Sequence, residues 1–256
     1  PVVIWHYQPI ITPKKKWREW LGRLFYRGID DMFFFSQKLY DDSLKTKKAR
    51  QERMHVGHWG ADMDYYDRIM KEHPADQHVG FISTGRERRD MKTLVAAFNE
   101  TDARLDIYLN KNNCGIDYEQ MFRNMEVRDN VNVHFMSGYQ QANLSATVYH
   151  SACVVICCLE TKYTVGLTTV VEALAFGLPI ICSRNPQIPV DFDKEKCGIS
   201  VPYYDKEGWI RAIRYVQEHP DEARKMGQRA RQLAEQMYND RRCAAEVAQV
   251  LKKYER

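Results

Sequence analysis

The sequence predicts an α/β protein built around a doubly wound parallel sheet, and two observations support this. Between residues 78 and 203, six short β-rich segments alternate with segments of helical periodicity, which is the pattern of successive βαβ units. The composition is that of a globular domain, with 44% hydrophobic and 28% charged residues, and it excludes a disordered chain. Sheets of this kind bind ligands beyond the carboxyl ends of their strands, so functional residues are expected there.

The strands expected in this sheet are residues 78–84, 104–110, 130–136, 152–159, 178–183 and 198–203. The segments between them carry apolar residues three and four positions apart, as Met91, Leu94, Val95 and Phe98 do, and are expected to be helices. Beyond residue 203 the pattern predicts three more helices, at about 206–219, 220–238 and 241–254.

A smaller set of elements comes first: a strand at 1–5, a basic amphipathic helix at 13–27, a strand at 32–35, a helix at 36–53 and a short strand at 54–58. Three strands and two helices offer little surface for closing a core. The chain also begins with proline instead of methionine, so we interpret this part as the remainder of a larger domain. Residues 60–64 have turn composition and are expected to link the two parts.

The formal net charge of +4 over 256 residues is too small for a dedicated nucleic-acid-binding protein, so no nucleic-acid partner is expected. No apolar run reaches the roughly 18 residues of a membrane-spanning helix. Several of the seven cysteines, among them Cys153, Cys157, Cys158 and Cys182, lie in apolar runs, as small core residues do. This usage indicates a reducing, cytoplasmic location, and the absence of a Cys-x-x-Cys pair argues against a zinc site.

The first loop whose residues could bind a ligand follows the strand at 78–84. There Gly85 precedes Arg86, Arg89 and Lys92 at the start of a helix. Arginine offers paired donors to phosphate, and a helix N-terminus adds backbone N–H groups. The spacing alone fits a phosphate site and an ordinary solvated loop about equally well.

The second loop joins the strand at 152–159 to a helix through Gly166. Glycine permits close backbone approach, and the amides of Leu167 and Thr168 would face an anion there. Glu172 lies four residues after Thr168, on the same helical face and about one turn below the anion. A carboxylate accepts hydrogen bonds from both hydroxyls of a ribose, so this arrangement suits a nucleotide. Apolar neighbours predict that Glu172 is partly buried and has a partner.

These residues resemble the donor half of glycosyltransferase family 4, which has the GT-B fold. The similarity lies in Gly85-Arg86 with Arg89, in the run from Gly166-Leu167-Thr168-Thr169 through Glu172 to Ile180, and in Cys197-Gly198-Ile199-Ser200-Val201-Pro202 with Asp205. It covers nearly the whole chain. The resemblance implies a remnant of an acceptor-side, Rossmann-like domain at 1–65, a donor-binding domain at 66–240, and a last helix, 241–256, that crosses back to the first domain.

The resemblance also implies an activity. A sugar would move from a nucleotide sugar, linked to UDP, GDP or ADP, to an acceptor, with retention at the anomeric carbon. The acceptor would be a glycan or lipid-linked precursor of a cell-surface polysaccharide. No metal or other cofactor is expected.

Residue by residue, the resemblance assigns the donor diphosphate to Arg86, Arg89, Gly166, Leu167 and Thr168, with Arg89 standing where lysine is usual. It assigns the ribose to Glu172. Thr164 takes the place of the first Glu in the family's E-x7-E motif, and as a neutral group it would hydrogen-bond the sugar. Glu160 lies nearby but out of register.

His6, at the end of the first strand, matches the family's active-site histidine and is the predicted catalytic residue. A histidine in this position is also commonly capped or solvated. Ser137, Gly138 and Tyr139 follow the strand at 130–136 and are expected near the base. Asp62-Met63-Asp64 has the Asp-x-Asp form that binds a metal in other glycosyltransferases, but its place in the link favours a hinge.

The helix at 13–27 combines Lys14, Lys15, Lys16, Arg18, Arg23 and Arg27 with Trp17, Trp20, Leu21, Leu24 and Phe25. The apolar set keeps helical spacing and is expected to pack on the first domain's sheet. Residues 14–27 are also suited to peripheral contact with anionic headgroups at the inner face of a membrane, as in relatives with lipid-linked acceptors. The alternative is a solvated basic face.

Two other functions stay open on the sequence alone. A non-catalytic sugar-nucleotide-binding module, or a partner of an active subunit, would account for the missing first Glu and the small first domain. A sugar-nucleotide epimerase of similar fold would need further carboxylates facing the sugar, and the sequence offers no clear set.

Overall fold

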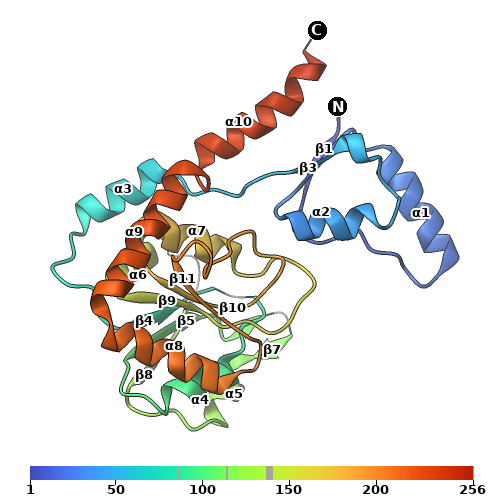
Figure 1. Ribbon diagram of the computed structural model, residues 1–256. Helices are drawn as coiled ribbons and strands as arrows, with labels where there is room; N and C mark the ends of the chain where they lie inside the picture. The colour runs from blue at the N-terminus through green and yellow to red at the C-terminus, as the bar shows by residue number, and fades with distance from the viewer. Residues whose placement is uncertain (86, 114, 137–140, 256) are drawn as a thin grey trace.

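The computed structural model describes residues 1–85, 87–113, 115–136 and 141–255, and it consists of two α/β units joined by a link (Figure 1). The larger unit contains a six-stranded sheet in the order β11-β10-β9-β4-β5-β8, with every described pairing parallel. Its strands are β4 (Phe81–Ser83), β5 (Leu105–Leu109), β8 (Val131–Phe135), β9 (Cys153–Ile156), β10 (Ile180–Ser183) and β11 (Gly198–Val201). The predicted doubly wound sheet and its six strands are therefore confirmed.

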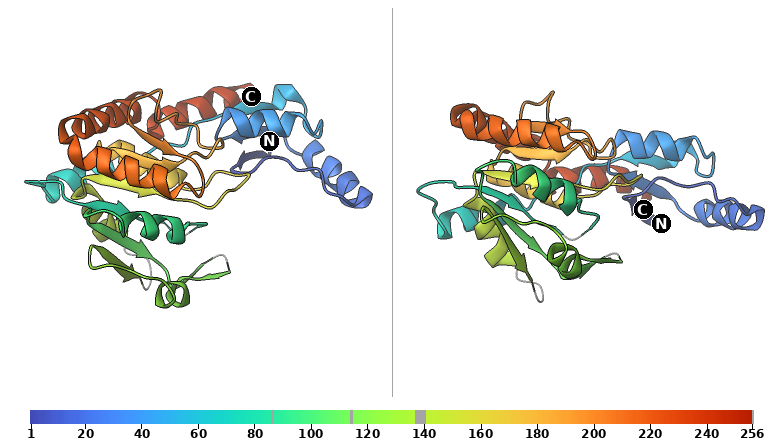
Figure 2. Two further views of the ribbon diagram at one scale, coloured as in Figure 1. Left: turned by 60° about the horizontal axis from the view of Figure 1, so that its bottom comes forward. Right: turned by 90° about the horizontal axis from the view of Figure 1, so that it is seen from below.

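Helices cover both faces of this sheet, as Figure 2 shows. They are α4 (Met91–Phe98), α5 (Tyr118–Arg123), α6 (Gln141–Tyr149), α7 (Leu167–Phe176), α8 (Lys206–Glu218) and α9 (Pro220–Gln236). One face packs Leu94 and Trp209 into a core, and the other packs Leu174 and Ala230. The order of the strands reverses between β4 and β9, so a crevice opens at their carboxyl ends. A short antiparallel pair after β5, β6 (Asn112–Asn113) with β7 (Ile116–Asp117), was not predicted.

The smaller unit has three parallel strands in the order β1-β2-β3. Its elements are β1 (Val3–His6), α1 (Lys16–Arg27), β2 (Asp31–Phe34), α2 (Gln37–Leu44), the 3-10 turn η1 (Gln51–Arg53) and β3 (Met54–Val56). The prediction of one helix over 36–53 was wrong in its second half. Lys47 has a left-handed backbone, with φ at 54°, and this turn directs the buried ammonium of Lys48 to Glu19 at 2.6 Å. A continuous helix cannot contain that turn.

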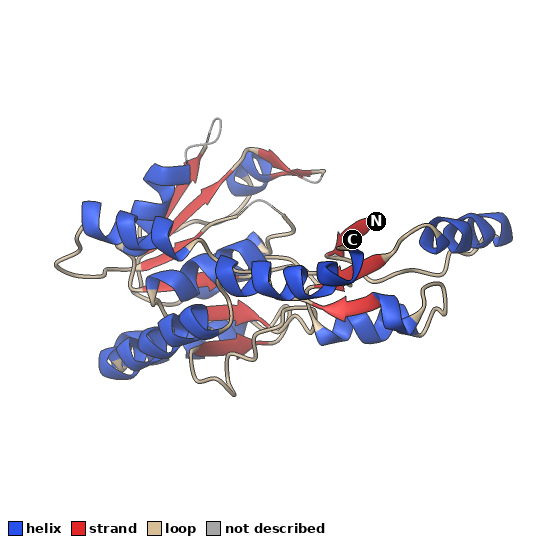
Figure 3. Ribbon diagram, turned by 90° about the horizontal axis from the view of Figure 1, so that it is seen from above, coloured by secondary structure: helices blue, strands red, loops and turns tan. Residues whose placement is uncertain are grey.

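The helix α1 also departs from its prediction, because it buries none of its side chains. Its large apolar residues are 45–64% exposed, namely Trp17, Trp20, Leu21, Leu24 and Phe25. Figure 3 shows α1 reaching away from both sheets. The helical spacing was right, but the expectation that this face packs on the first sheet was wrong, since amphipathic spacing does not determine what covers the apolar face.

The link from the first unit runs against the start of the last helix, α10 (Asp240–Leu251). Ala61 accepts a hydrogen bond from the amide of Asp240 and donates one to the carbonyl of Tyr238, both at 2.9 Å. The chain then enters α3 (Met63–Glu72), which Asp62 caps by accepting from the amide of Tyr65. The two units therefore meet at a hydrogen-bonded crossing.

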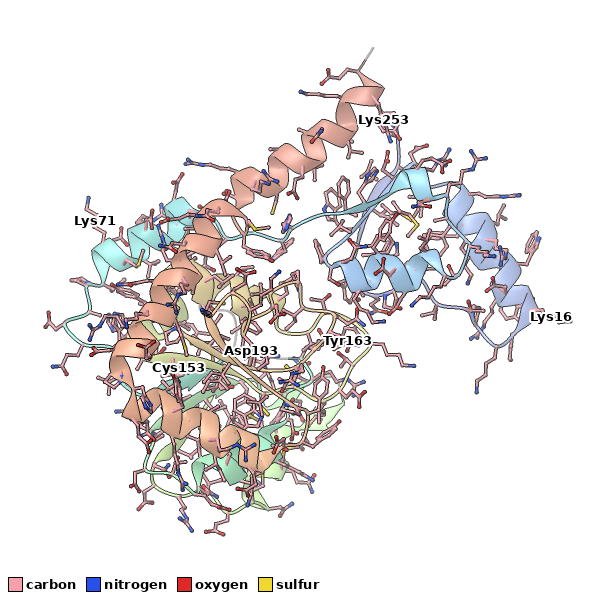
Figure 4. All side chains as sticks on the ribbon, in the orientation of Figure 1. Lys16, Lys71, Cys153, Tyr163, Asp193 and Lys253 are labelled. Atoms are coloured by element: carbon pink, nitrogen blue, oxygen red, sulfur yellow. The ribbon has the colours of Figure 1, made fainter. Side chains whose placement is uncertain are left out.

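The last helix reaches back to the first unit, and Figure 4 labels Lys253 near its end. Asp31 on β2 is fully buried. Burial alone would raise the pKa of Asp31, but hydrogen bonds from Lys253 (2.6 Å), Tyr254 (2.5 Å) and His55 (2.7 Å) outweigh it and hold that pKa below its ordinary value. Residues far apart in the sequence thus fasten the end of the chain to the first sheet.

Replacing Gly60 with alanine is expected to disturb this crossing. A Cβ atom at this position would lie 2.2 Å from the carbonyl carbon of Asn239, which is backbone and cannot rotate away. We expect the free energy of unfolding to fall by about 1–3 kcal/mol, measured by denaturant titration. Gly28→Ala is the matched control, because its Cβ would meet only an ordinary contact at 3.5 Å; equal stability of the two variants would contradict the prediction.

Candidate functional site

A cavity of about 500 Å³ lies at the carboxyl ends of β4, β5 and β9, where the two units face each other. The larger unit lines it with Thr84, Arg89 and the residues around Gly166. The smaller unit contributes three aromatic side chains, Tyr7, Phe35 and Trp59. Its place at the switch point of the sheet agrees with the expectation for a doubly wound fold.

Arg89 is the buried cation of this cavity, with only 3% of its surface exposed. Its Nε donates to the carbonyl of Thr84 at 3.1 Å, and its Nη2 contacts Thr169 Oγ1 at 3.4 Å. Its Nη1 lies 3.2 Å from both the carbonyl of Glu87 and the sulfur of Cys158. These contacts fix the guanidinium against the loops that the sequence singled out.

Two glycines make room for this guanidinium. Gly85 and Gly166 both have left-handed backbones, with φ at 102° and 86°. A Cβ at Gly85 would lie 2.0 Å from Nη2 of Arg89, and one at Gly166 would lie 3.6 Å from Nη1 and 2.8 Å from Ile156. The two loops therefore close around Arg89, and both backbones demand glycine.

The helix α7 begins directly after Gly166, which is its N-cap and offers no side-chain cap. Leu167 and Thr168 line the cavity at this N-terminus. Their amide groups are among the first of the helix, which have no partner within it and carry the positive end of its dipole. Arg86, the other predicted diphosphate ligand, lies outside the described residues.

No ion pair among the described residues joins Arg89 to a carboxylate, although many surface arginines have one. A buried charge without a counter-ion is costly, because it has lost its hydration. Together with the amides of α7, Arg89 therefore forms a positively charged site that suits an anion.

Glu172, the sixth residue of α7, lines the same cavity from the second turn of that helix. Its Oε1 accepts a hydrogen bond of 2.8 Å from Ser145 on α6, so the structure supplies the partner that the sequence analysis expected. Burial raises the pKa of Glu172 to about 7, and the Ser145 hydroxyl opposes this rise. The carboxyl is thus poised between its two charge states near neutral pH.

Thr164 is buried at the edge of the cavity. Its amide donates to the carbonyl of Tyr7 at 2.9 Å, across the junction of the two units. Its hydroxyl lies 3.4 Å from the carbonyl of Gln187. Thr164 therefore helps to hold the units together, and its predicted contact with a sugar stays a prediction.

His6 is half-buried in the first unit. Its ring stacks on Phe34, with centroids 5.1 Å apart, and lies 5.8 Å from the ring of Tyr26. Burial lowers its pKa, and its Nε2 is buried without a hydrogen-bond partner in the described part of the chain. His6 is not among the described residues that line the cavity, whereas Tyr7 is; its catalytic role stays a prediction.

The predicted base contacts Ser137, Gly138 and Tyr139 lie outside the described residues. Tyr108, Leu109 and Asn110, at the end of β5, line the cavity on that side, and the sequence analysis did not select them. The rule that ligands bind at the carboxyl ends of strands could have found them, because they are the last three residues of the predicted strand at 104–110.

Glu87 is a further cavity residue that the sequence analysis did not select. Its Oε1 accepts a hydrogen bond of 2.8 Å from the hydroxyl of Tyr163. In the sequence this carboxylate stands within a run of arginines, and the pattern drew attention to those cations and not to Glu87.

The Asp-x-Asp segment has structural contacts. Asp62 caps α3, and Asp64 pairs with Arg241 at 2.8 Å. Within the described ranges, no group of three or more His, Cys, Asp or Glu side chains is arranged to hold a metal ion. The arrangement as a whole places a buried cation and the first amides of α7, which suit an anion, beside a carboxyl group that can accept hydrogen bonds from hydroxyls.

Comparisons with known proteins give a family and a fold. The family model described as "Glycosyl transferases group 1" matches residues 67–233. No curated protein sequence matches the chain.

The chain is similar, at low identity, to many solved structures, of which three follow. HepE of Anabaena, crystallised with UDP and glucose, has a TM-score of 0.73 at 13% identity, covering 98% of this chain and 71% of its own. Sucrose-phosphate synthase of Thermosynechococcus elongatus has a TM-score of 0.75 at 16% identity, and the match covers 98% of this chain and 67% of the synthase. The UDP-forming α,α-trehalose-phosphate synthase of Burkholderia vietnamiensis has a TM-score of 0.71 at 12% identity, and the match covers 100% of this chain and 70% of the synthase. At these identities the likeness shows the fold alone.

Proposed function

The chain belongs to the glycosyl transferases group 1 family and has the GT-B fold, and from this premise we propose that it transfers a sugar from a nucleoside diphosphate donor to a hydroxyl acceptor. One observation carries the proposal. Arg89 is a buried cation without a carboxylate partner in the described chain, and it lies beside the N-terminus of α7. A diphosphate supplies the charge that this site lacks.

The site residues fit the steps of such a transfer. When the bond between the sugar and the diphosphate breaks, negative charge develops on the leaving group, and Arg89 with the amides of Leu167 and Thr168 would stabilise it. Stabilisation of this kind is commonly worth several kcal/mol. Glu172 would accept hydrogen bonds from the ribose hydroxyls and fix the nucleoside. We further propose membership of glycosyltransferase family 4, retention at the anomeric carbon, and His6 as the group facing the sugar, all from the motif resemblance.

Titration with UDP, GDP and ADP tests the nucleotide site. Saturable binding in the micromolar range by at least one of them is expected, followed by transfer or slow hydrolysis of its sugar conjugate. Binding without either reaction would favour a non-catalytic sugar-nucleotide-binding module. Failure of all three to bind would overturn the proposed site.

The acceptor is proposed to be a glycan or lipid-linked precursor of a polysaccharide, met at an anionic membrane surface on the cytoplasmic side. The exposed face of α1 supports this proposal. It presents Trp17, Trp20 and Phe25, each more than half exposed. The exposed cations of this segment are Lys14 and Lys15, directly before the helix, and Lys16, Arg18, Arg23 and Arg27 within it. Tryptophans with cations on one short helix suit the headgroup layer. None of the helices in the described part of the chain is long and apolar enough to cross a bilayer.

Co-sedimentation with vesicles tests the membrane contact. We expect binding to vesicles that contain anionic lipid and little binding to neutral vesicles, because each Lys or Arg near an anionic surface contributes about 1 kcal/mol. The double substitution Trp17→Ala with Trp20→Ala should abolish sedimentation. Tyr215→Ala, an exposed aromatic on α8, is the matched control. Equal binding to neutral and anionic vesicles would contradict the proposed attraction between the cations of this segment and anionic lipid.

A further inference from the structure

The cavity contains a second acidic side chain whose role the nucleotide site does not explain. Among the described residues that line it, the carboxylates are those of Glu87 and Glu172. Glu172 lies below the N-terminus of α7, where the ribose is proposed to bind. Glu87 belongs to the loop after β4, two residues before Arg89, and is half-buried.

Glu87 is held in place by one hydrogen bond to its carboxylate and another to its main chain. The hydroxyl of Tyr163 donates to Oε1 at 2.8 Å, and Arg89 Nη1 donates to the main-chain carbonyl of Glu87 at 3.2 Å. Burial, and then the hydrogen bond to Glu87, raise the pKa of Tyr163, so its hydroxyl keeps its proton and remains the donor. Figure 4 labels Tyr163 on the side of the larger unit that faces the first one. A carboxylate whose position is fixed in this way can bind a ligand in a defined geometry, which a mobile surface charge cannot do.

Electrostatics decides what such a group can bind. A carboxylate repels a diphosphate, so Glu87 is not a phosphate ligand although it shares a loop with Arg89. It is an acceptor only, with capacity for donors beyond Tyr163, and hydroxyl groups are donors that carry no charge. The sugar of a nucleotide sugar is joined directly to the phosphate, so its hydroxyls come to the part of the cavity adjoining Arg89.

The neighbouring candidate for this role is already engaged. Thr164 follows Tyr163, and its hydroxyl lies 3.4 Å from the carbonyl of Gln187. As a neutral group it also makes weaker hydrogen bonds than a carboxylate does. On this side of the cavity, Glu87 therefore offers the stronger acceptor.

We propose that Glu87 accepts hydrogen bonds from the hydroxyls of the transferred sugar and so selects a hydroxyl-rich sugar, with Tyr163 as the residue that positions it. This inference rests on the proposed function. It adds a specificity-determining residue in a loop that the sequence pattern assigned to phosphate.

The test compares each nucleoside diphosphate with its own glucose conjugate: UDP with UDP-glucose, GDP with GDP-glucose, and ADP with ADP-glucose. Calorimetry gives both dissociation constants for the unsubstituted chain, Glu87→Gln and Tyr163→Phe, and the tightest-binding pair decides. In Glu87→Gln the sugar conjugate should bind about tenfold more weakly, the loss expected for a hydrogen bond to a charged group, while the free diphosphate binds at least as well as before. Tyr163→Phe should shift the same ratio in the same direction by a smaller factor.

Glu160→Gln is the matched control. It removes the same charge from a nearby position, but Glu160 is not among the described residues that line the cavity. An unchanged ratio in Glu87→Gln, with diphosphate binding intact, would overturn the inference and leave the proposed function standing. Loss of diphosphate and conjugate binding by equal factors would also overturn it, since Glu87 would then serve the loop and not the sugar. Failure of all six compounds to bind the unsubstituted chain would overturn both.

Discussion

Replacing Arg89 with alanine is expected to weaken nucleoside diphosphate binding by about 30- to 5,000-fold. The guanidinium is buried, and truncating one member of a desolvated charge pair costs about 2–5 kcal/mol. The substitution also leaves the carbonyl of Thr84 without its 3.1 Å donor and opens space between Gly85 and Gly166. Calorimetric titration with UDP, GDP and ADP measures the effect.

Two further variants separate charge from packing. Arg89→Lys keeps the cation, and lysine is the residue that the resembling family usually carries here, so this variant should retain binding within about tenfold. Arg104→Ala removes an exposed cation that pairs with Asp106 outside the cavity, and it should bind as the unsubstituted chain does. If Arg89→Ala folds, as judged by its circular dichroism and thermal transition, and binds normally, the diphosphate is not held at Arg89.

The sequence predicted the half of the site that depends on chain order within one domain. Gly85, Arg89, Gly166 and Glu172 all follow strands of one parallel sheet, and the carboxyl ends of such strands meet at one edge. The structure brings these residues to a single cavity. Their spacing in the sequence, with the rule for strand ends, was sufficient for this.

The other half of the site, which the first unit lines, depends on how the two units pack together. Local sequence patterns do not predict that packing. Tyr7 and Phe35 directly follow β1 and β2, so the rule for strand ends places them at one edge of the first sheet. That this edge, with Trp59, faces the cavity of the larger unit depends on how the two units pack together. The apolar face of α1 depends on the same kind of information. Its helical spacing predicted the helix, but did not show that this face is exposed. The early end of α2 goes with long-range contacts of Lys48, whose ammonium pairs with Glu19 and donates to the carbonyl of Ile11.

Nucleotide binding is expected to weaken about tenfold between pH 8 and pH 6, through the titration of Glu172. The pKa of this carboxyl is raised by burial from an ordinary 4.5 to about 7. Ribose hydroxyls donate hydrogen bonds, so they favour the ionised carboxylate, which is the main form at pH 8. At pH 6 roughly one molecule in ten carries it, and the apparent affinity falls by that fraction. The probe is a nucleotide sugar, whose capped diphosphate does not titrate in this range, and calorimetry at several pH values measures the slope.

Glu172→Gln removes the titration and supplies the control. Its affinity should be independent of pH between 6 and 8, and lower than that of the unsubstituted chain at pH 8 by about tenfold. A pH slope that persists in this variant would assign the titration to another group.

The same carboxyl should act on stability with the opposite sign. Because its pKa is higher in the folded chain than in the unfolded one, the folded state binds more protons between pH 4.5 and about 7. The free energy of unfolding therefore falls as the pH rises through this window, by up to ~3 kcal/mol for this group. Glu172→Gln carries no such charge, so above pH 7 it should be more stable than the unsubstituted chain while binding nucleotide more weakly. Higher stability with weaker binding in one variant is the behaviour of a buried group kept for a ligand, and denaturant titration at pH 5 and pH 8 distinguishes it from a residue that serves packing alone, whose loss would lower the stability at both.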